Sequence, residues 1–322
     1  MMLGTPTKHA RGAMGNFTLC EDIVTNMARA VVGKRESLEL LLVGLLAEGH
    51  VLIEDVPGLG KTLIAKALAS SISGTFKRVQ FTPDLLPSDV TGYSVYNQQV
   101  AQFQLQPGPV VTNVLLADEI NRTIPRTQAS LLESMEERQV TIDGRTQKLP
   151  APFFVIATQN PIELEGTFPL PEAQLDRFLL RLSLGYPTPA EELIMLQRFQ
   201  REDPLPSITP VATPEQVIAL QHARREIEVS SALQKYIVDL VAATRKHEAL
   251  RFGVSPRGSL ALMRAAQALA ALRGRSHVLP DDVKHLARPV LAHRLSVKSA
   301  ERLRGVTAEH VLAQVLETTA VL

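Results

Sequence analysis

Cysteine and unbalanced charge are both scarce in this chain. Its single cysteine, Cys20, excludes an internal disulfide and a cysteine-based metal cluster, and it is typical of a reducing cytosol. The 34 Lys and Arg residues almost match the 33 Asp and Glu residues, which leaves a formal net charge of +1. That balance disfavours a protein whose main task is to neutralise nucleic-acid phosphates or an anionic membrane.

Long apolar runs are also missing. The longest strong run, residues 40–47, lies between two glutamates and is less than half of the roughly 20 residues that span a bilayer. Residues 1–16 are small and polar and carry no signal-peptide pattern, so we expect a loose N-terminal tail. These features predict a cytoplasmic protein without membrane contact.

The chain nevertheless contains what a folded α/β domain needs. Hydrophobic residues make up 45% of its 322 residues and charged residues 21%, and at about 150 residues per domain this length favours two domains. Up to residue 186, short apolar runs alternate with helical spacing, which predicts a mostly parallel sheet covered on both faces. The runs that predict strands are 51–56, 76–81, 111–120, 153–160 and 178–184.

From residue 187 onward the pattern predicts helices alone. Two of them begin with the same signal, a threonine, then proline, then Glu or Gln three residues after the threonine: Thr188 with Glu191, and Thr213 with Gln216. We therefore predict an α/β domain over residues 17–186 and a helical domain over residues 187–322.

A phosphate-binding loop is the strongest chemical signal. In IEDVPGLGKTL, Gly58 and Gly60 allow the backbone N–H groups to surround phosphate oxygens, Lys61 adds a positive charge, and the Thr62 hydroxyl is a ligand for Mg²⁺. One position departs from the usual pattern, because Asp55 stands where the first glycine is expected. The remaining predicted nucleotide contacts in the loop are Pro57, Leu59 and Leu63.

Acidic and amide side chains follow two other predicted strands. VLLADEI ends with Asp118, suited to Mg²⁺, and Glu119, suited to orienting a water molecule against the γ-phosphate. Asn160 ends FFVIATQN and is equally well explained as a holder of that water molecule or as a turn residue.

These segments together resemble the MoxR family of AAA+ ATPases over about residues 24–322. The resemblance is carried by PGLGKT, FTPDLLPSDVTG, GPVVTNVLLADEINR, QASLLESMEERQVTIDG, FFVIATQNPIELEGTFPLPEAQLDRF and SPRGSLALMRAAQALA. It implies an AAA+ nucleotide-binding α/β domain followed by a small all-helical lid, with ATP and Mg²⁺ as cofactors. It also implies a hairpin-bearing insert in the second helix, here at about residues 91–109.

The resemblance further implies roles for individual residues. Asn160 corresponds to the sensor of the γ-phosphate, and Arg177 to the arginine finger that reaches a neighbouring subunit's nucleotide. Arg257 corresponds to the lid's second sensor, and whether it acts on its own chain or on the neighbour stays open. Val32 and Gly33 would line the adenine, although an apolar residue before glycine is also typical of a core.

The implied function is that of a chaperone-like ATPase that works as a homo-oligomer, a hexameric ring. Its partners would be a protein client and a von Willebrand factor A domain protein, with remodelling, activation or cofactor insertion as the result. One alternative is a nucleotide-gated protein-binding switch with slow turnover. A nucleic-acid-dependent motor is disfavoured by the near-zero charge and the absence of tryptophan.

The predicted insert and the residues after Glu119 carry weaker signals. Tyr93 and Tyr96 are typical of packing within a hairpin, and contact with a client is the weaker alternative. Arg122 and Arg126 are explained equally well as surface charges or as subunit contacts.

Overall fold

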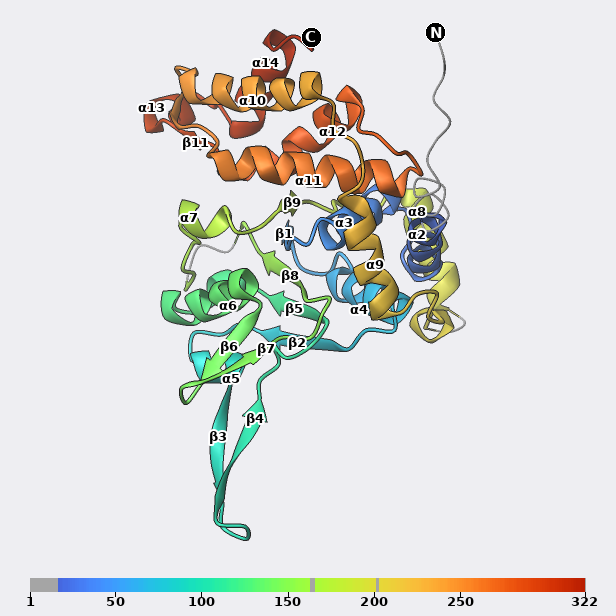
Figure 1. The fold of residues 1–322 in the computed structure, drawn as a ribbon, viewed down its shortest axis with the longest axis vertical. Coiled ribbons are helices and arrows are strands. Elements are labelled where there is room, and N and C mark those ends of the chain that lie inside the picture. The colour runs from blue at the N-terminus through green and yellow to red at the C-terminus, as the bar shows by residue number, and fades with distance from the viewer. Residues whose placement is uncertain (1–16, 163–165, 201–202, 322) are drawn as a thin grey trace.

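The computed structural model describes residues 17–162, 166–200 and 203–321, so the predicted tail over residues 1–16 lies outside it. An α/β body occupies the middle of the molecule, a helical part lies on one side of it, and a β-hairpin projects from the other side (Figure 1). Among the described residues, no helix has the length and apolar character that a bilayer-spanning segment requires.

A five-stranded sheet forms the centre of the body. Its order is β2-β5-β8-β1-β9 and every neighbouring pair is parallel, which confirms the predicted sheet. Most of the strands are a few residues shorter than the apolar runs that predicted them. They are β1 Val51–Glu54, β2 Phe76–Gln80, β5 Val114–Asp118, β8 Phe154–Gln159 and β9 Leu180–Leu182.

Both faces of this sheet are covered, as the alternation of side chains along a strand requires. On β5, Val114 and Leu116 belong to one buried cluster, whereas Leu115 and Ala117 belong to another. The helices α2 Thr18–Ala30, α3 Arg35–Leu46 and α4 Lys61–Ser71 lie on the first face, and α5 Pro87–Thr91 and α6 Pro125–Glu137 on the second. Cys20 lies in the first cluster, where burial raises the pKa of its thiol to about 12.

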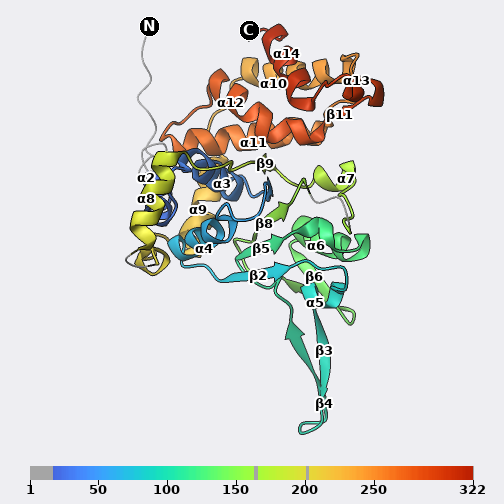
Figure 2. The ribbon, with the colours of Figure 1, turned by 180° about the vertical axis from the view of Figure 1, so that it is seen from behind.

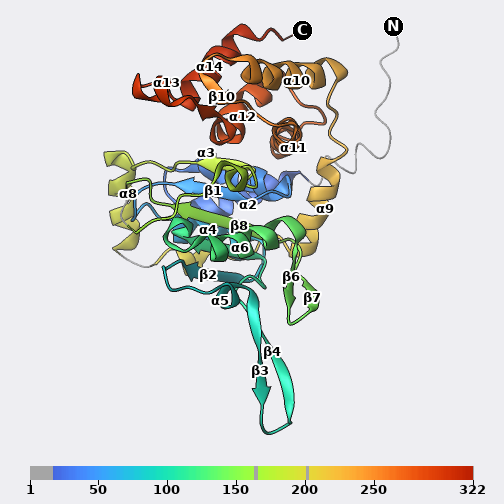
Figure 3. The same ribbon diagram turned by 90° about the vertical axis from the view of Figure 1, so that its left-hand side faces the viewer.

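Two hairpins interrupt the α/β order. Strands β6 Gln139–Ile142 and β7 Arg145–Lys148 turn at Asp143-Gly144, and both of these residues have positive φ. Strands β3 Gly92–Asn97 and β4 Gln102–Pro107 form the insert and extend away from the body (Figures 1 and 3).

The insert exposes more apolar surface than hairpin packing predicts. Tyr96 does pack edge to face on Phe103, with ring centroids 5.3 Å apart. Tyr93 and Tyr96 are nevertheless each 51% exposed, and Phe103 is 74% exposed. The description of the two tyrosines as packing residues is therefore incomplete, because a two-stranded hairpin has no second layer to cover either face.

Two helices after residue 187 lie beside the α/β body. Helix α8 Pro189–Phe199 and helix α9 Pro214–Arg224 both begin with the predicted capping box. Arg198 of α8 donates a 2.8 Å hydrogen bond to the Arg29 carbonyl at the end of α2, and α9 contacts α3. Figure 2 shows α8 next to α2 on the side of the body opposite to α7 (Glu172–Leu175).

The remaining helices form the lid above the sheet. They are α10 Ser231–Lys246, α11 Pro256–Leu272, α12 Pro280–Leu291, α13 Ser299–Leu303 and α14 Ala308–Thr318. The expected all-helical lid is wrong in one detail, because β10 Leu250–Phe252 and β11 Ser296–Val297 pair in antiparallel fashion. Helix α11 packs on α3, and buried residues of body and lid belong to one continuous cluster.

Candidate functional site

The turn from β1 into α4 has the backbone shape of a phosphate-binding loop. Gly58 has φ 87° and Gly60 has φ 82°, a left-handed backbone conformation that residues with a Cβ atom rarely adopt. Helix α4 starts directly after it at Lys61, so the unbonded N–H groups of its first turn lie at the loop. Such a helix start binds anions, which agrees with the predicted role.

Lys61 is held by the loop itself. Its Nζ donates a 2.6 Å hydrogen bond to the backbone carbonyl of Asp55. Burial lowers the pKa of Lys61, while the nearby charges of Asp55, Asp118 and Glu119 act in the opposite direction. The ammonium group therefore lies among carboxylates and a carbonyl. A bound phosphate would replace the carbonyl as its hydrogen-bond acceptor.

Asp55, which stands where the usual pattern has glycine, connects the phosphate-binding loop to a neighbouring segment of the chain. Its buried carboxylate accepts hydrogen bonds from the Ser183 hydroxyl at 2.8 Å and from the backbone N–H groups of Leu184 and Gly185. Its own N–H continues the sheet by donating to the Gln159 carbonyl at 3.2 Å. Residue 55 has no positive φ and therefore needs no glycine, and its side chain attaches the loop to the segment after β9.

Asp118 ends β5 and Glu119 follows it directly, so the predicted strand end lies beside the phosphate loop. Asp118 Oδ1 accepts a 2.6 Å hydrogen bond from the Thr158 hydroxyl, and Asp118 Oδ2 accepts one of 2.7 Å from Arg78. Glu119 Oε2 accepts a 2.6 Å hydrogen bond from Gln80 and forms an ion pair of 3.2 Å with Arg122 Nε. Glu119 has φ 57°, so its backbone adopts a strained conformation at this position.

Sequence reasoning missed the residues that hold these two carboxylates. Arg78 and Gln80 come from β2, an edge strand whose Gln80 lies opposite Asp118 in the register, and Thr158 comes from β8. The signal was the alternation in FKRVQF, where Arg78 and Gln80 share one face of the strand.

One cavity of about 270 Å³ collects most of the predicted nucleotide residues. It is lined by Pro57, Gly58, Gly60, Lys61, Thr62, Arg78, Gln80, Asp118, Glu119 and Asn160. Asn160 is thus brought to the same place as Lys61 and Glu119, and its Oδ1 accepts a hydrogen bond from the Ile162 N–H at 3.2 Å. The hydroxyl of Thr62 and the carboxylate of Asp118 are hard oxygen ligands of the kind that Mg²⁺ prefers, so the donor set fits that ion.

Four other predicted contacts do not line this cavity. Leu59 and Leu63 pack against the large buried cluster instead. Val32 and Gly33 lie between α2 and α3, where Gly33 has φ 70° and its Cα faces the Glu191 side chain at the start of α8. Their role at the adenine stays a prediction.

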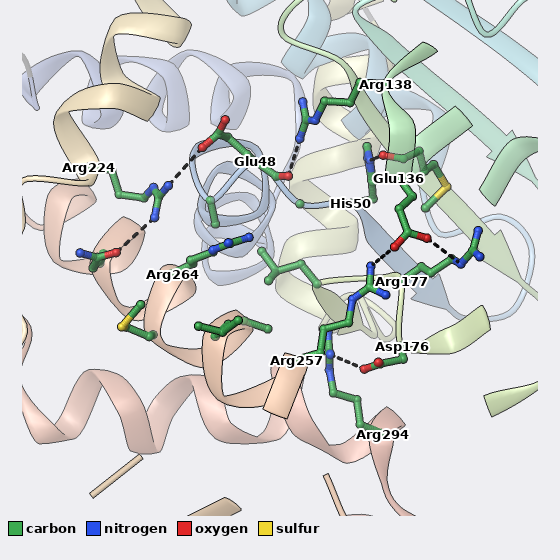
Figure 4. Close-up of a pocket in the computed structure, with 18 of the residues that line it drawn as sticks. Glu48, His50, Glu136, Arg138, Asp176, Arg177, Arg224, Arg257, Arg264 and Arg294 are labelled. Carbon is green, nitrogen blue, oxygen red and sulfur yellow. Dashed lines mark hydrogen bonds and ion pairs between the residues drawn. The ribbon is translucent and has the colours of Figure 1, made fainter. Parts of the chain in front are cut away.

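Arg177 and Arg257 meet at a different place. Arg177 follows α7 and Arg257 is the second residue of α11, and both contact Glu136 of α6. Arg177 Nε lies 3.3 Å from Glu136 Oε2, and Arg257 Nη2 lies 3.0 Å from Glu136 Oε1 (Figure 4). Neither arginine lines the phosphate-loop cavity of its own chain.

The cavity that holds these two arginines has a volume of about 760 Å³ and lies between body and lid. Near them, the Arg294 guanidinium pairs with Asp176 at 2.5 Å, and burial lowers the pKa of Arg294 to about 10. The cavity is strongly basic, because its lining, within the described ranges of the chain, has three acidic residues, Glu48, Glu136 and Asp176, against seven arginines. The arginines are Arg138, Arg177, Arg224, Arg225, Arg257, Arg264 and Arg294.

Comparison with known proteins places this fold and site among ATPases. Residues 50–180 match the family described as ATPases associated with various cellular activities (AAA), and residues 242–315 match the AAA lid domain. The protein YeaC of Bacillus subtilis is 51% identical, over 92% of this chain and 93% of its own length. Chaperone MoxR1 of Mycobacterium tuberculosis is 43% identical, over 98% of this chain and 85% of its own length.

A solved structure agrees with these sequence relatives. The crystal structure of a candidate ATPase from Cytophaga hutchinsonii superimposes with a TM-score of 0.92 and 36% sequence identity, covering 98% of both chains. The likeness therefore includes the α/β body and the lid together.

Proposed function

The chain belongs to the MoxR family of AAA+ ATPases, and from this premise we propose that it hydrolyses ATP in a ring of identical subunits, remodelling or activating a protein client. The observation that carries the proposal is the separation of the catalytic groups. Lys61, Glu119 and Asn160 share one cavity, whereas Arg177 and Arg257 share another. A complete active site then requires two chains.

Within one chain, the phosphate-loop cavity binds and prepares the reaction. The N–H groups of the loop and Lys61 would hold the phosphates, and Thr62 with Asp118 would hold Mg²⁺, which supplies charge neutralisation at the phosphates. Glu119 would orient the attacking water molecule, with Asn160 reading the γ-phosphate. For this Glu119 must leave Gln80 and Arg122, both of which contact its Oε2.

The second chain would contribute Arg177 and Arg257. Both are cations on one face of the subunit, and their shared Glu136 orients them without belonging to the phosphate-loop cavity. An arginine supplied across an interface increases the rate of phosphoryl transfer by about 10³–10⁵. The geometry supports action of Arg257 on the neighbour, which was open from the sequence.

A protein client and a von Willebrand factor A domain partner are the further parts of the proposal, and they rest on the family. The hairpin β3–β4 suits contact with a client, since it extends from the body and exposes tyrosine, phenylalanine and valine side chains. The described part of that hairpin carries no Lys or Arg, which disfavours nucleic acid as the client.

Mixing two inactive variants tests the shared active site. Arg177→Ala subunits keep an intact phosphate loop and Lys61→Ala subunits keep an intact Arg177. Each variant alone should hydrolyse ATP poorly, and their mixture should recover part of the wild-type turnover. Sedimentation of the mixture confirms that joint rings form. The proposal fails if joint rings form and no ratio of the two variants recovers activity.

A nucleotide-gated switch with slow turnover is the second candidate. It is favoured by the two contacts that occupy Glu119 Oε2, because they restrain the carboxylate from moving toward a water molecule at the γ-phosphate. Turnover measured with and without the partner protein distinguishes the two functions. A motor hydrolyses ATP continuously with a client, whereas a switch completes about one turnover per binding event.

A further inference from the structure

The cavity between body and lid has a second basic end that the proposed ATPase does not use. It is formed by Arg138 after α6, by Arg224 and Arg225 at the end of α9, and by Arg264 of α11. Figure 4 shows Arg224 and Arg264 on one side of the cavity and Arg177 and Arg257 on the other. Among the described residues that line this end, Glu48 alone carries a carboxylate.

Glu48 contacts several arginines at once. Its Oε2 lies 3.2 Å from Arg224 Nη2 and 2.8 Å from Arg225 Nη2, and its backbone carbonyl accepts a 2.5 Å hydrogen bond from Arg138. The remaining contact of Arg224 is neutral, a 3.2 Å hydrogen bond from Nη1 to the Gln267 side-chain oxygen. One negative charge therefore faces four positive charges.

Part of this basic end is left without a partner. Arg224 is only 3% exposed, yet its Nε has no acceptor among the described residues. Arg264 forms no ion pair within the described part of the chain. Burial lowers the pKa of Arg224, the charge of Glu48 acts in the opposite direction, and the charges of Arg225 and Arg264 lower the pKa further. Arginines gathered in this way repel one another, which is unfavourable in the protein alone. Such a cluster is typical of a site that binds an anion.

The backbone conformation of Glu48 also supports an anion site. Glu48 follows the end of α3 with φ 57°, a position where helices commonly carry glycine because a side chain is strained there. A glutamate at this strained position brings its carboxylate to Arg224 and Arg225, and holds them toward the cavity.

We propose that this end of the cavity, formed by Arg138, Arg224, Arg225 and Arg264, binds a compact anion with two or more phosphate groups. Guanidinium groups match phosphate oxygens with paired hydrogen bonds, and several together outcompete a single carboxylate. The cavity volume of about 760 Å³ lies in the range of small-molecule sites, and Leu260 and Met263 supply apolar wall for an organic part of the ligand. The anion contacts α9 and α11 together with the turn at Glu48, so it stabilises the contact between body and lid.

Inorganic pyrophosphate is the probe, titrated by calorimetry into full-length Lys61→Ala protein, in which the phosphate loop no longer competes. We expect saturable binding of one pyrophosphate per chain and a higher melting temperature in its presence. The double variant Arg225→Ser/Arg264→Ser should bind at least about tenfold more weakly, the loss of two charge-assisted contacts. Arg288→Ser is the matched control, because Arg288 is an exposed helical arginine outside the cavity, and it should bind normally.

Two further variants fix the position of the anion. Glu48→Gln should bind pyrophosphate more tightly, since it removes the carboxylate that competes for Arg224 and Arg225. Arg177→Ser should leave the affinity unchanged, because Arg177 lies at the other end. Citrate, which carries carboxylates in place of phosphates, should bind at least about tenfold more weakly than pyrophosphate.

Several results would overturn the assignment. They are the absence of saturable binding, equal affinity in Arg225→Ser/Arg264→Ser, or a loss of affinity in Arg177→Ser alone. Weaker binding in Glu48→Gln also contradicts it, provided that the melting temperature shows the variant folded. Each of these readouts is independent of ATP hydrolysis, so failure of the proposed ATPase leaves this test intact.

Discussion

Gln80 donates a 2.6 Å hydrogen bond to Glu119, from an edge strand that borders the strand carrying the glutamate. The bond occupies the same oxygen that Arg122 contacts, so the carboxylate proposed to orient the attacking water molecule is restrained from two sides. Under the proposed function, hydrolysis would depend on how easily Glu119 is released from these two contacts, and Gln80 can be replaced without changing Lys61, Thr62 or Asp118.

Gln80→Ala should raise the basal turnover of ATP. A hydrogen bond to a charged group contributes about 1.5–3 kcal/mol, so an increase of up to about tenfold is expected, because Arg122 still restrains Glu119. Steady-state ATPase assays in the absence of client check this, with Glu119→Gln as the variant that binds ATP and does not turn over. A decrease in Gln80→Ala would mean that Gln80 positions Glu119 for catalysis.

Glu136→Gln should lower turnover while leaving ATP affinity unchanged. The variant removes the charge that orients Arg177 and Arg257, and Glu136 does not line the phosphate-loop cavity. We expect a loss of about 10- to 100-fold in turnover, smaller than the effect of an arginine finger itself. Nucleotide binding followed by fluorescence, beside the ATPase assay, separates the two quantities. The neighbouring Glu137→Gln is the control, and weaker ATP binding in Glu136→Gln would contradict the separation of the two cavities.

Asp55→Gly, which restores the usual glycine, should destabilise the protein. It removes the acceptor of the Ser183 hydroxyl and of the Leu184 and Gly185 N–H groups. Loss of a charged, buried acceptor costs about 1–3 kcal/mol, and a glycine adds freedom to the unfolded chain. Chemical denaturation measures the change, and Asp55→Asn, which keeps one acceptor oxygen, should lose less. Equal or greater stability of Asp55→Gly would show that the contacts to residues 183–185 are unimportant.

Acid should destabilise the chain through two buried histidines. Burial lowers the pKa of His50 to about 3 and that of His293 well below its usual value, and His50 is neutral between the Val155 N–H and the Met135 carbonyl. Both imidazoles take up a proton on unfolding, so their contribution is present above pH 6.5 and is lost as the pH falls toward 3. At pH 5 the cost is about 2 kcal/mol for His50, and His293 acts in the same direction.

Urea unfolding between pH 7.5 and 5 measures this effect. The loss of stability with falling pH should be smaller in His50→Gln and unchanged in His222→Gln, which alters an exposed histidine of α9. The same pH dependence in His50→Gln and in the parent protein would exclude His50 as a source.

The predictable part of the site is the part that strand ends bring together. Asp118 and Glu119 lie at the end of a strand of the parallel sheet, where an apolar run ending in acidic residues placed them, and Lys61 was placed by the glycine-rich turn that follows another strand. Asn160 also ends an apolar run, but its role came from the family resemblance. The five strands and the two capping boxes were predictable because each depends on residues close together in the sequence, whereas the insert hairpin was implied by the family resemblance.

The rest depends on contacts between distant residues. Gln80 meets Glu119 only because β2 is the neighbour of β5, and strand order is not written in either segment. Arg177 and Arg257 were assigned by family, yet their common partner Glu136 is known only from the folded chain, where the start of α11 and the segment after α7 both reach the end of α6. The basic end of the cavity combines the ends of α3, α6 and α9 with the middle of α11, so no local pattern could indicate it.

The buried cluster that joins α3 to the lid leaves little room for the two parts to move separately. We therefore expect each subunit to rotate as one rigid body when its neighbour exchanges nucleotide. A rotation of a few degrees at the contact between two subunits would then displace the tip of β3–β4 much farther than it displaces the lid. That tip lies at the end of the molecule opposite to the lid (Figure 1).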